Sequence, residues 1–248
     1  LNRLRNIHQP VQRTPEWYEF RNNLLSASSI SKIFGSEAQR NSLIYEKCSP
    51  TSQSIKNPNL TSALHWGVKY EPVTVMVYEH MFHTKIAEFG CIRHPQYEYI
   101  GASPDGINVD PDSPRYGRML EIKNIVNREI TGVPKEEYWV QTQIQMETCD
   151  LDLCDFMETR FIEYSNTDDF YNDTNREYRG VILYFIENDT KSPTINNPRY
   201  KYMPLEISID KDEIDEWVQM TREESKKEGL VLFQTIYWYL EEYSCVLI

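Results

Sequence analysis

The residues best suited to chemistry lie in the stretch that ends with Lys123. Asp105 stands in the run Ser-Pro-Asp-Gly at residues 103–106, where an apolar stretch meets a glycine and a strand is expected to bend or end. Glu121 and Lys123 follow in Leu-Glu-Ile-Lys at residues 120–123. Because side chains alternate along a strand, Glu121 and Lys123 leave one face while Ile122 points into the core. If the two segments pair as neighbouring strands, two carboxylates and an ammonium group converge.

An aspartate and a glutamate together provide hard oxygen ligands, which suit Mg²⁺ or Mn²⁺ rather than zinc. A lysine beside them can hold the attacking water or help to deprotonate it. Together these side chains are suited to hydrolysing a phosphodiester. Each part has an ordinary explanation as well, because Glu-x-Lys usually marks a solvated face and Asp-Gly usually marks a turn. The joint pattern is much more specific than either part.

The pattern extends along the chain in a recognisable order. It comprises Arg-Thr-Pro-Glu-Trp at 13–17, Arg21, Ser-Ala-Ser at 26–28, Trp-Gly at 66–67, Tyr-Glu-Pro at 70–72, Ser-Pro-Asp-Gly at 103–106, Leu-Glu-Ile-Lys at 120–123 and Tyr-Trp-Val-Gln-Thr-Gln at 138–143. Residues 13–165 thereby resemble the YqaJ-type viral recombinase family, which contains the lambda exonuclease and belongs to the PD-(D/E)XK nuclease superfamily. The resemblance implies an α/β fold with a restriction-endonuclease-like core, in which helices flank a central mixed β-sheet.

The resemblance also assigns roles to residues around this core. Asp105 and Glu121 would bind Mg²⁺ with help from the backbone carbonyl of Ile122, and Mn²⁺ could substitute. Glu71, which as a lone acid would be a surface residue, looks like an additional active-site carboxylate. Lys123 would orient the attacking water.

Two further parts of the family pattern concern the substrate and the nucleophile. Gln141 would fix Lys123 or the nucleophile, although without the family it would be an ordinary exposed helix residue. Arg21 projects from a helix near serine hydroxyls and near the start of a second helix, which makes an anion site. Arg21 and Ser28 look like the pair that receives a substrate phosphate; the alternative is that Arg21 is simply a surface charge.

The activity implied is 5′-to-3′ exonuclease action on the ends of double-stranded DNA in viral recombination or replication. By resemblance, candidate partners are a single-strand annealing protein and further copies of the chain in a homotrimer. Two alternatives stay open. One is an endonuclease or RNA-degrading nuclease on the same fold, and the other is a non-catalytic DNA-binding or assembly subunit. Joint retention of Asp105, Glu121 and Lys123 favours an enzyme, since a scaffold does not need the set.

Composition limits the choice of class. With 248 residues and 40% apolar content, the chain is an ordinary globular protein. The net charge of −12 is unusual for a DNA-binding protein, but Lys and Arg outnumber Asp and Glu in residues 1–75, so a local positive groove is compatible with it. Five cysteines without regular spacing predict reduced thiols in a cytosol-like compartment, the host cytoplasm or nucleus if the source is viral. The sequence has no apolar run of membrane-spanning length, so we expect no membrane association.

The length predicts one domain over residues 1–248, which the resemblance implies is a nuclease domain. We expect a loose basic arm at 1–12, a family-like core at 13–165 and a divergent part at 166–248 that supplies strands and C-terminal helices. We expect Glu121 and Lys123 to face a wet site rather than the core. We expect Thr14 to cap a first helix and Asp210 to cap an acidic helix near the C-terminus, and we expect Pro72 to kink the helix that contains it or to mark its local start. The segments expected in order are helices at 15–25 and up to 35, a loop at 49–62, a helix at 61–82, strands at 86–92, 99–107 and 119–125, a helix at 135–149, strands at 156–164, 181–186 and 200–207, loops at 165–176 and 191–199, a helix at 211–227 and an aromatic segment at 230–243.

Overall fold

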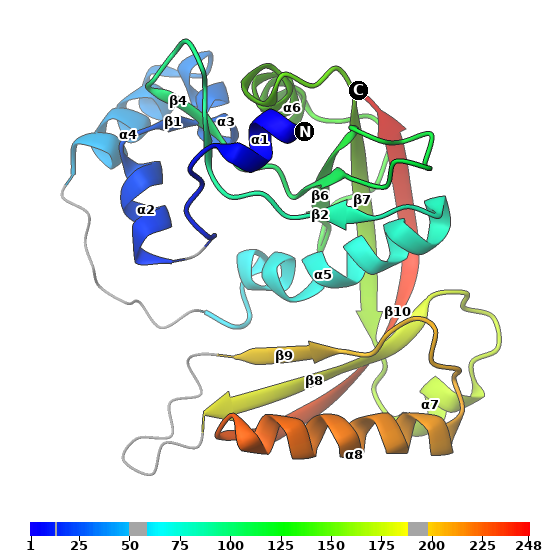
Figure 1. Ribbon diagram of the computed structural model, residues 1–248. Coiled ribbons are helices and arrows are strands. Elements are labelled where there is room, and N and C mark those ends of the chain that lie inside the picture. Colours follow the sequence, from blue (N-terminus) through cyan, green and yellow to red (C-terminus); the bar gives the residue numbers. More distant parts are fainter. Residues whose placement is uncertain (13, 50–58, 188–197) are drawn as a thin grey trace.

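A mixed β-sheet crossed by helices organises the molecule (Figure 1). The computed structural model describes residues 1–12, 14–49, 59–187 and 198–248. Within these ranges the main sheet has seven strands, in the spatial order β2 (Ile86–Ala87), β5 (Gly106–Asn108), β6 (Met119–Asn124), β7 (Cys154–Glu163), β10 (Leu230–Leu247), β8 (Arg179–Glu187) and β9 (Arg199–Tyr202). β6 and β7 pair in parallel and the other neighbours are antiparallel, so the expected central mixed sheet is confirmed.

The two faces of β6 and β7 carry different chemistry. The parallel register sets Glu121 beside Phe156 and Lys123 beside Glu158, so these four side chains leave the same face. Helix α6 (Glu136–Cys149) covers this face, since Gln145 donates a hydrogen bond to Glu121. Helix α5 (Ala63–Phe82) crosses the opposite face.

On the α5 face, Asp155 is 1% exposed and anchors several elements at once. Its carboxylate accepts hydrogen bonds from the Tyr78 hydroxyl at 2.5 Å and from Arg118 at 3.2 Å, and it forms an ion pair with Arg115. A buried carboxylate is stable only with such partners. These contacts tie α5 and the loop after β5 to β7, next to the strand that carries Glu121.

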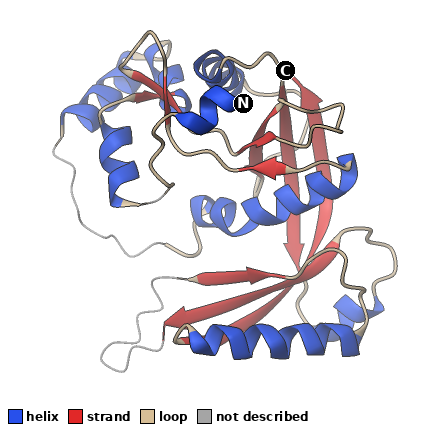
Figure 2. Ribbon diagram, in the orientation of Figure 1, coloured by secondary structure: helices blue, strands red, loops and turns tan. Residues whose placement is uncertain are grey.

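In the lower part of the molecule, as oriented in Figure 2, a further helix covers one face of the same sheet. Strands β7 and β10 run from the upper part into the lower part, where α8 (Lys211–Lys227) lies along β8 and β10 (Figure 2). Asp210 caps α8 by accepting from the backbone N–H groups of Asp212 and Glu213, as the sequence predicts. Val181 and Leu183 pack in the cluster that includes α8, whereas Ile182 belongs to the cluster beneath α5. Both faces of β8 are therefore buried, which explains its continuous apolar sequence.

A smaller sheet and several helices form the N-terminal part. The small sheet has the order β1 (Leu25–Ser26), β4 (Ile100–Ala102) and β3 (Ile92–Arg93), with β1 parallel to β4. Helix α2 (Pro15–Asn22) is capped by the Thr14 hydroxyl, as predicted. After β1 come α3 (Ala27–Ile30), the 3₁₀ helix η1 (Ser31–Ile33) and α4 (Glu37–Cys48), which starts at a capping box. The sequence pattern did not identify α4.

The expected loose arm at residues 1–12 is wrong. It contains α1 (Asn2–Asn6), and Leu4 is 1% exposed in a cluster with Phe89, Ile92 and Met119. Leu1, Leu4 and Ile7 are spaced three residues apart, and Leu1 and Ile7 pack against the same cluster, but a five-residue helix is too short for such spacing to be recognised in a polar segment.

Other boundaries also differ from expectation. The strand expected at 99–107 is split into β4 and β5, which belong to different sheets, because Pro104 interrupts the ladder between them. The loop expected at 165–176 contains α7 (Thr167–Asn172), whose Phe170 is buried. The strand expected at 200–207 ends at Tyr202, and the aromatic segment from Leu230 is one strand. Helix α5 passes through Pro72 without ending there. Arg13, residues 50–58 and most of the loop expected at 191–199 lie outside the described residues.

No helix in the described ranges combines the length and the apolar character of a membrane span. All five cysteines are free thiols, as expected. The compartment itself stays a prediction.

Candidate active site

The break between β4 and β5 positions Asp105 at the edge of β6. The ladder between β5 and β6 ends at the pair of Gly106 and Leu120, so the next N–H on that side of β6, at Ile122, has no strand partner there. Asp105 Oδ2 accepts a hydrogen bond from it at 2.7 Å. In a strand, the N–H and the C=O of one residue point to the same side, so the Ile122 carbonyl also faces Asp105. Only glycine fits at position 106, because a Cβ there would lie 2.2 Å from Ile86 Cγ2.

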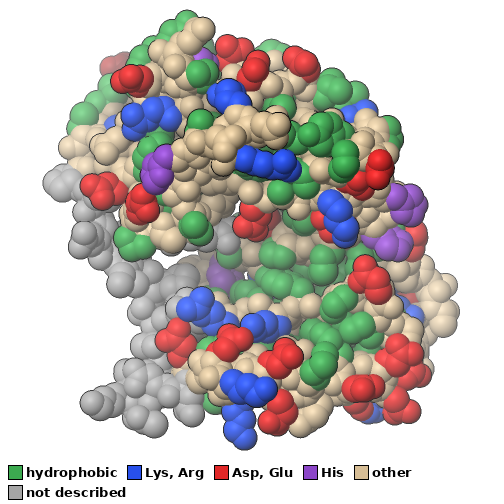
Figure 3. Space-filling view, viewed as in Figure 1, with side chains coloured by type: hydrophobic (Ala, Val, Ile, Leu, Met, Phe, Trp, Pro, Cys, Tyr) green, Lys and Arg blue, Asp and Glu red, His purple; other side chains and the backbone are tan. Residues whose placement is uncertain are grey.

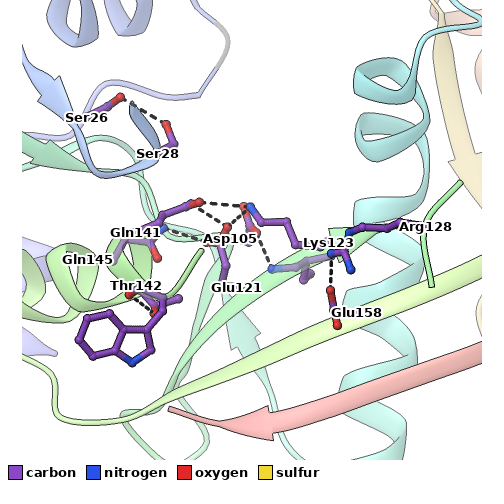
Figure 4. Close-up of polar contacts among 12 residues, drawn as sticks. Ser26, Ser28, Asp105, Glu121, Lys123, Arg128, Gln141, Thr142, Gln145 and Glu158 are labelled. Carbon is purple, nitrogen blue, oxygen red and sulfur yellow. Dashed lines mark hydrogen bonds and ion pairs between the residues drawn. The ribbon is translucent and has the colours of Figure 1, made fainter. Parts of the chain in front are cut away.

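Glu121 lies at the centre of the hydrogen-bond network (Figure 4). Its Oε1 accepts from Lys123 Nζ at 2.5 Å and from Gln141 Nε2 at 2.7 Å, and its Oε2 accepts from Gln145 Nε2 at 2.8 Å. Glu121 is 1% exposed, so the expectation that it faces water is wrong. Helix α6 closes over it and replaces water with two amide groups.

The role of Gln145 could have been found from the sequence. Gln145 lies four residues after Gln141 and therefore shares its helix face. The pattern that resembles the family ends at residue 143, so Gln145 received no role. Both glutamines are buried in the structure, which rules out the ordinary exposed position that was the alternative for Gln141.

Lys123 contacts three groups of the site. Besides Glu121, its ammonium donates to Gln141 Oε1 at 3.3 Å and lies 4.8 Å from the centre of the Tyr138 ring. Burial lowers the pKa of Lys123, but the negative charges of Glu121 and Asp105 outweigh burial and raise it. The side chain is therefore an ammonium ion at neutral pH. As an ammonium ion it can hold an oxygen atom by donating a hydrogen bond, but it is a poor base.

For Asp105, burial and the neighbouring acids both shift the pKa in the same direction. Burial raises the pKa of Asp105, and the negative charges of Glu121 and of Glu71 on α5 raise it further; Lys123 and the Ile122 N–H only partly compensate. Glu71 thus lies close enough to act on Asp105, although it comes from the other side of the sheet. Asp105 keeps some solvent exposure, so the excess of negative charge is accessible from outside.

The donor set determines which metal would fit. In the described part of the chain, no group of three or more His, Cys, Asp and Glu side chains is arranged to hold a metal by itself. Asp105 and Glu121 lie close enough for the charge of Glu121 to raise the pKa of Asp105, and the Ile122 carbonyl lies on the side of β6 that faces Asp105 (Figure 4). An all-oxygen set of this size suits Mg²⁺, which usually keeps several waters and takes substrate phosphate oxygens, and it does not suit zinc.

Arg21 and Ser28 meet away from the acidic cluster. Arg21 Nη2 donates to Ser28 Oγ at 2.7 Å, and the Arg21 guanidinium lies 4.8 Å from the centre of the Trp17 ring. Ser26 Oγ is 3.3 Å from Ser28 Oγ. The expected proximity of Arg21 to the serine hydroxyls is therefore confirmed, whereas the phosphate-binding role stays a prediction. The second helix, α3, is a single turn, so any anion would be held by side chains rather than by a helix terminus.

Strand pairing connects this pair to the acidic cluster. β1 places Ser26 beside Gly101 of β4, four residues before Asp105. Leu24 packs directly on Gly101, since a Cβ at that position would lie 2.6 Å from Leu24 Cδ1. In Figure 4, Ser26 and Ser28 lie on one side of Gln141 and Gln145, apart from Lys123. The two motifs therefore lie in one region of the molecule without touching.

The surface charge is mixed rather than uniformly basic. In Figure 3, Lys and Arg are interspersed with Asp and Glu on both the upper and the lower part, and a hollow between the two parts shows hydrophobic side chains. This agrees with the net charge of −12. Any attraction for nucleic acid would come from local groups outside the acidic cluster, such as Arg21.

Comparison with solved structures defines the class of fold. The chain is similar to the crystal structure of an alkaline exonuclease, LHK-Exo from Laribacter hongkongensis, with a TM-score of 0.50 and 20% identity over 86% of this chain and 99% of that one. A second structure, of LHK-Exo in complex with dAMP, gives a TM-score of 0.49 and 22% identity, with the same coverage of both chains. The chain is thus a mixed α/β protein with the fold of an alkaline exonuclease.

Sequence comparison gives the family. Residues 16–152, more than half of the chain, match the YqaJ-like viral recombinase domain. The chain belongs to the YqaJ-like viral recombinase family, as its motifs predict. It is also 27% identical over 281 residues to "Uncharacterized protein R354" of Acanthamoeba polyphaga mimivirus. That match covers all of this chain, which spans about half the length of the mimivirus protein.

Proposed function

We propose that this protein is a Mg²⁺-dependent deoxyribonuclease with a PD-(D/E)XK core that degrades linear double-stranded DNA from its 5′ ends. The observation that carries this proposal is the convergence of Asp105, Glu121 and Lys123 at the open edge of β6. Membership of the YqaJ-like family and the likeness to an alkaline exonuclease support the nuclease class. The 5′ polarity rests on the family resemblance.

The metal site would be formed by the Asp105 and Glu121 carboxylates and the Ile122 carbonyl, with Glu71 as a further acid. A bound Mg²⁺ or Mn²⁺ ion would polarise the phosphodiester and stabilise the charge that develops on its oxygens. Gln141 and Gln145 hold the Glu121 carboxylate in one orientation, each through a hydrogen bond to a different oxygen atom. This leaves the site preorganised, because Glu121 need not rotate when the substrate arrives.

Lys123 would orient the attacking water and stabilise negative charge on the phosphate. Its ammonium is fixed by Glu121 and Gln141 at 2.5 and 3.3 Å and is protonated at neutral pH. A protonated lysine donates hydrogen bonds to oxygen atoms, so it positions water and supports the developing charge rather than removing the proton itself.

Arg21 and Ser28 would receive the 5′-terminal phosphate. Arg21 already donates to the Ser28 hydroxyl, and both belong to a segment that strand pairing holds next to the β4–β5 turn. A guanidinium group is well suited to phosphate because it offers several donors in one plane. A terminal phosphate bound there would orient the strand relative to the acidic cluster.

The decisive experiment compares three DNA substrates in Mg²⁺. The wild-type protein should degrade 5′-phosphorylated linear duplex faster than 5′-hydroxyl duplex and should leave a covalently closed circular plasmid intact. Cleavage of the circle at the same rate would identify an endonuclease, and preference for RNA substrates an RNA-degrading enzyme. Binding of DNA ends without any cleavage would identify the non-catalytic subunit.

A further inference from the structure

Lys123 lies between two acidic side chains on the same face of the sheet. Glu121 precedes it by two residues on β6, and Glu158 is directly beside it on β7 in the parallel register. Neighbouring strands are about 4.8 Å apart, so a lysine side chain can reach either carboxylate. Glu158 is as deeply buried as Glu121, with 1% exposure. Nevertheless Lys123 donates to Glu121.

A second cationic side chain forms an ion pair with Glu158. Arg128, in the loop between β6 and α6, forms an ion pair with Glu158, and Figure 4 shows it reaching Glu158 from the side opposite to the Glu121 cluster. The loop is fixed by Arg160, whose Nη2 donates to the Arg128 carbonyl at 2.6 Å. The same Arg128 guanidinium lies 5.5 Å from the Tyr138 ring centre, on the ring that Lys123 also contacts.

The physical reason for this arrangement is the cost of an unpaired buried carboxylate. Removing one partner of a buried ion pair leaves a charge that must find another cation, and the cation next to Glu158 in the strand register is Lys123. Arg128 also repels the Lys123 ammonium, because both are positive and both border Tyr138. Both effects direct Lys123 toward Glu121.

We propose that Arg128 is a positioning residue, which saturates Glu158 and thereby keeps the Lys123 ammonium on Glu121 and Gln141. The catalytic consequence rests on the proposed nuclease function, whereas the position of the ammonium does not. Arg128 acts through Lys123 and needs no contact with DNA.

Three variants separate this role from a merely structural one. Arg128→Met should lower kcat about tenfold or more with little change in KM, which corresponds to losing one charge-assisted hydrogen bond. Glu158→Gln should stay within about threefold of wild type, since the partly exposed Arg128 can be solvated. The double variant should recover to the level of Glu158→Gln, because the competing carboxylate is gone. A double variant as impaired as Arg128→Met, or a rise in KM as the main effect, would overturn the proposal in favour of direct DNA contact.

A crystal structure of metal-free Arg128→Met tests the same idea without activity. Lys123 Nζ should move from Glu121 to Glu158, and an ammonium that stays on Glu121 would overturn the proposal. If Arg128→Met does not fold, Arg128→Lys should be nearly as active as wild type, because it still neutralises Glu158; a tenfold loss there would also contradict us. Absence of any nuclease activity in the wild type would instead refute the proposed function and leave the crystallographic test valid.

Discussion

Replacing Arg21 by alanine should abolish recognition of the terminal phosphate and leave the chemistry intact. Arg21 donates to Ser28 Oγ at 2.7 Å and lies over Trp17, and it has no contact with Glu121 or Lys123 among the interactions of the described residues. Its guanidinium group has no evident use in activating water. Its loss should therefore act on one substrate, the duplex that carries a 5′ phosphate.

The magnitude follows from the contact that is lost. A hydrogen bond between a charged donor and phosphate contributes about 1.5–3 kcal/mol, which is a factor of roughly 10 to 150 in rate at low substrate concentration. The stability cost should be small, about 0.5–1 kcal/mol, because the cation–π contact with Trp17 is partly solvated. Ser28→Ala removes only a neutral hydroxyl group and should cost about 0.5–1.5 kcal/mol, or up to about tenfold.

The assay is the ratio of kcat/KM on 5′-phosphorylated and 5′-hydroxyl duplex. In Arg21→Ala this ratio should approach one, with the rate on 5′-hydroxyl ends unchanged. Arg40→Ala is the matched control, since Arg40 is an exposed arginine of the same N-terminal part whose guanidinium donates to the Gly35 carbonyl. If Arg21→Ala slows both substrates equally, or if the wild type ignores the phosphate, Arg21 does not bind the terminal phosphate.

Four other outcomes are expected. Cleavage should require Mg²⁺ or Mn²⁺ and stop in EDTA; persistent cleavage in chelator would exclude the metal site. Glu121→Gln and Lys123→Ala should both abolish cleavage of 5′-phosphorylated linear duplex. Glu121→Gln should also lower the free energy of unfolding by about 1–3 kcal/mol in denaturant titrations, since a donor loses its buried acceptor. Because the pKa of Asp105 is raised above its ordinary value of 3.8, its contribution to stability is present below pH 3.8 and is lost as the pH rises through the folded-state pKa. The Tm of the metal-free protein should therefore fall with rising pH, and Asp105→Asn should flatten that fall. An unchanged pH profile in the variant would contradict the electrostatic crowding. Asp155→Asn should cost about 3 kcal/mol, because two arginines lose their counter-charge and one of the two acceptor oxygens becomes an NH2 donor; thermal melts of the metal-free protein would detect the loss.

The sequence predicted the local features that depend on neighbours in the chain. The caps at Thr14 and Asp210 are present because a side-chain oxygen next to a helix start satisfies nearby N–H groups whatever the tertiary context. The face shared by Gln141 and Gln145 follows from helix geometry alone. The sequence placed Asp105 where a strand was expected to bend or end at Gly106, but it did not predict that Pro104 divides the strand between two sheets.

Features that depend on strand register could not be predicted. Lys123 and Glu158 lie side by side only because β6 and β7 are parallel with this register, and nothing local to either strand determines that register. The burial of Glu121 depends on α6 folding back over the sheet, which made the expected wet environment wrong. The packing of Leu4 likewise depends on a cluster that residues far along the chain complete.

The way the acids of the sheet are neutralised indicates where a divalent cation would bind. Asp155 is paired with two arginines and Glu158 with Arg128, so each is balanced by at least one full positive charge. Among the described residues, Glu121 and Asp105 share the ammonium of Lys123, and their other hydrogen-bond donors are neutral: two amide groups for Glu121 and a backbone N–H for Asp105. Neutral donors fix the direction of a carboxylate without cancelling its charge, so this pair keeps a net negative charge where the others do not. We therefore expect the proposed divalent cation to bind beside Asp105 and Glu121, and without a cation the same imbalance raises the pKa of Asp105.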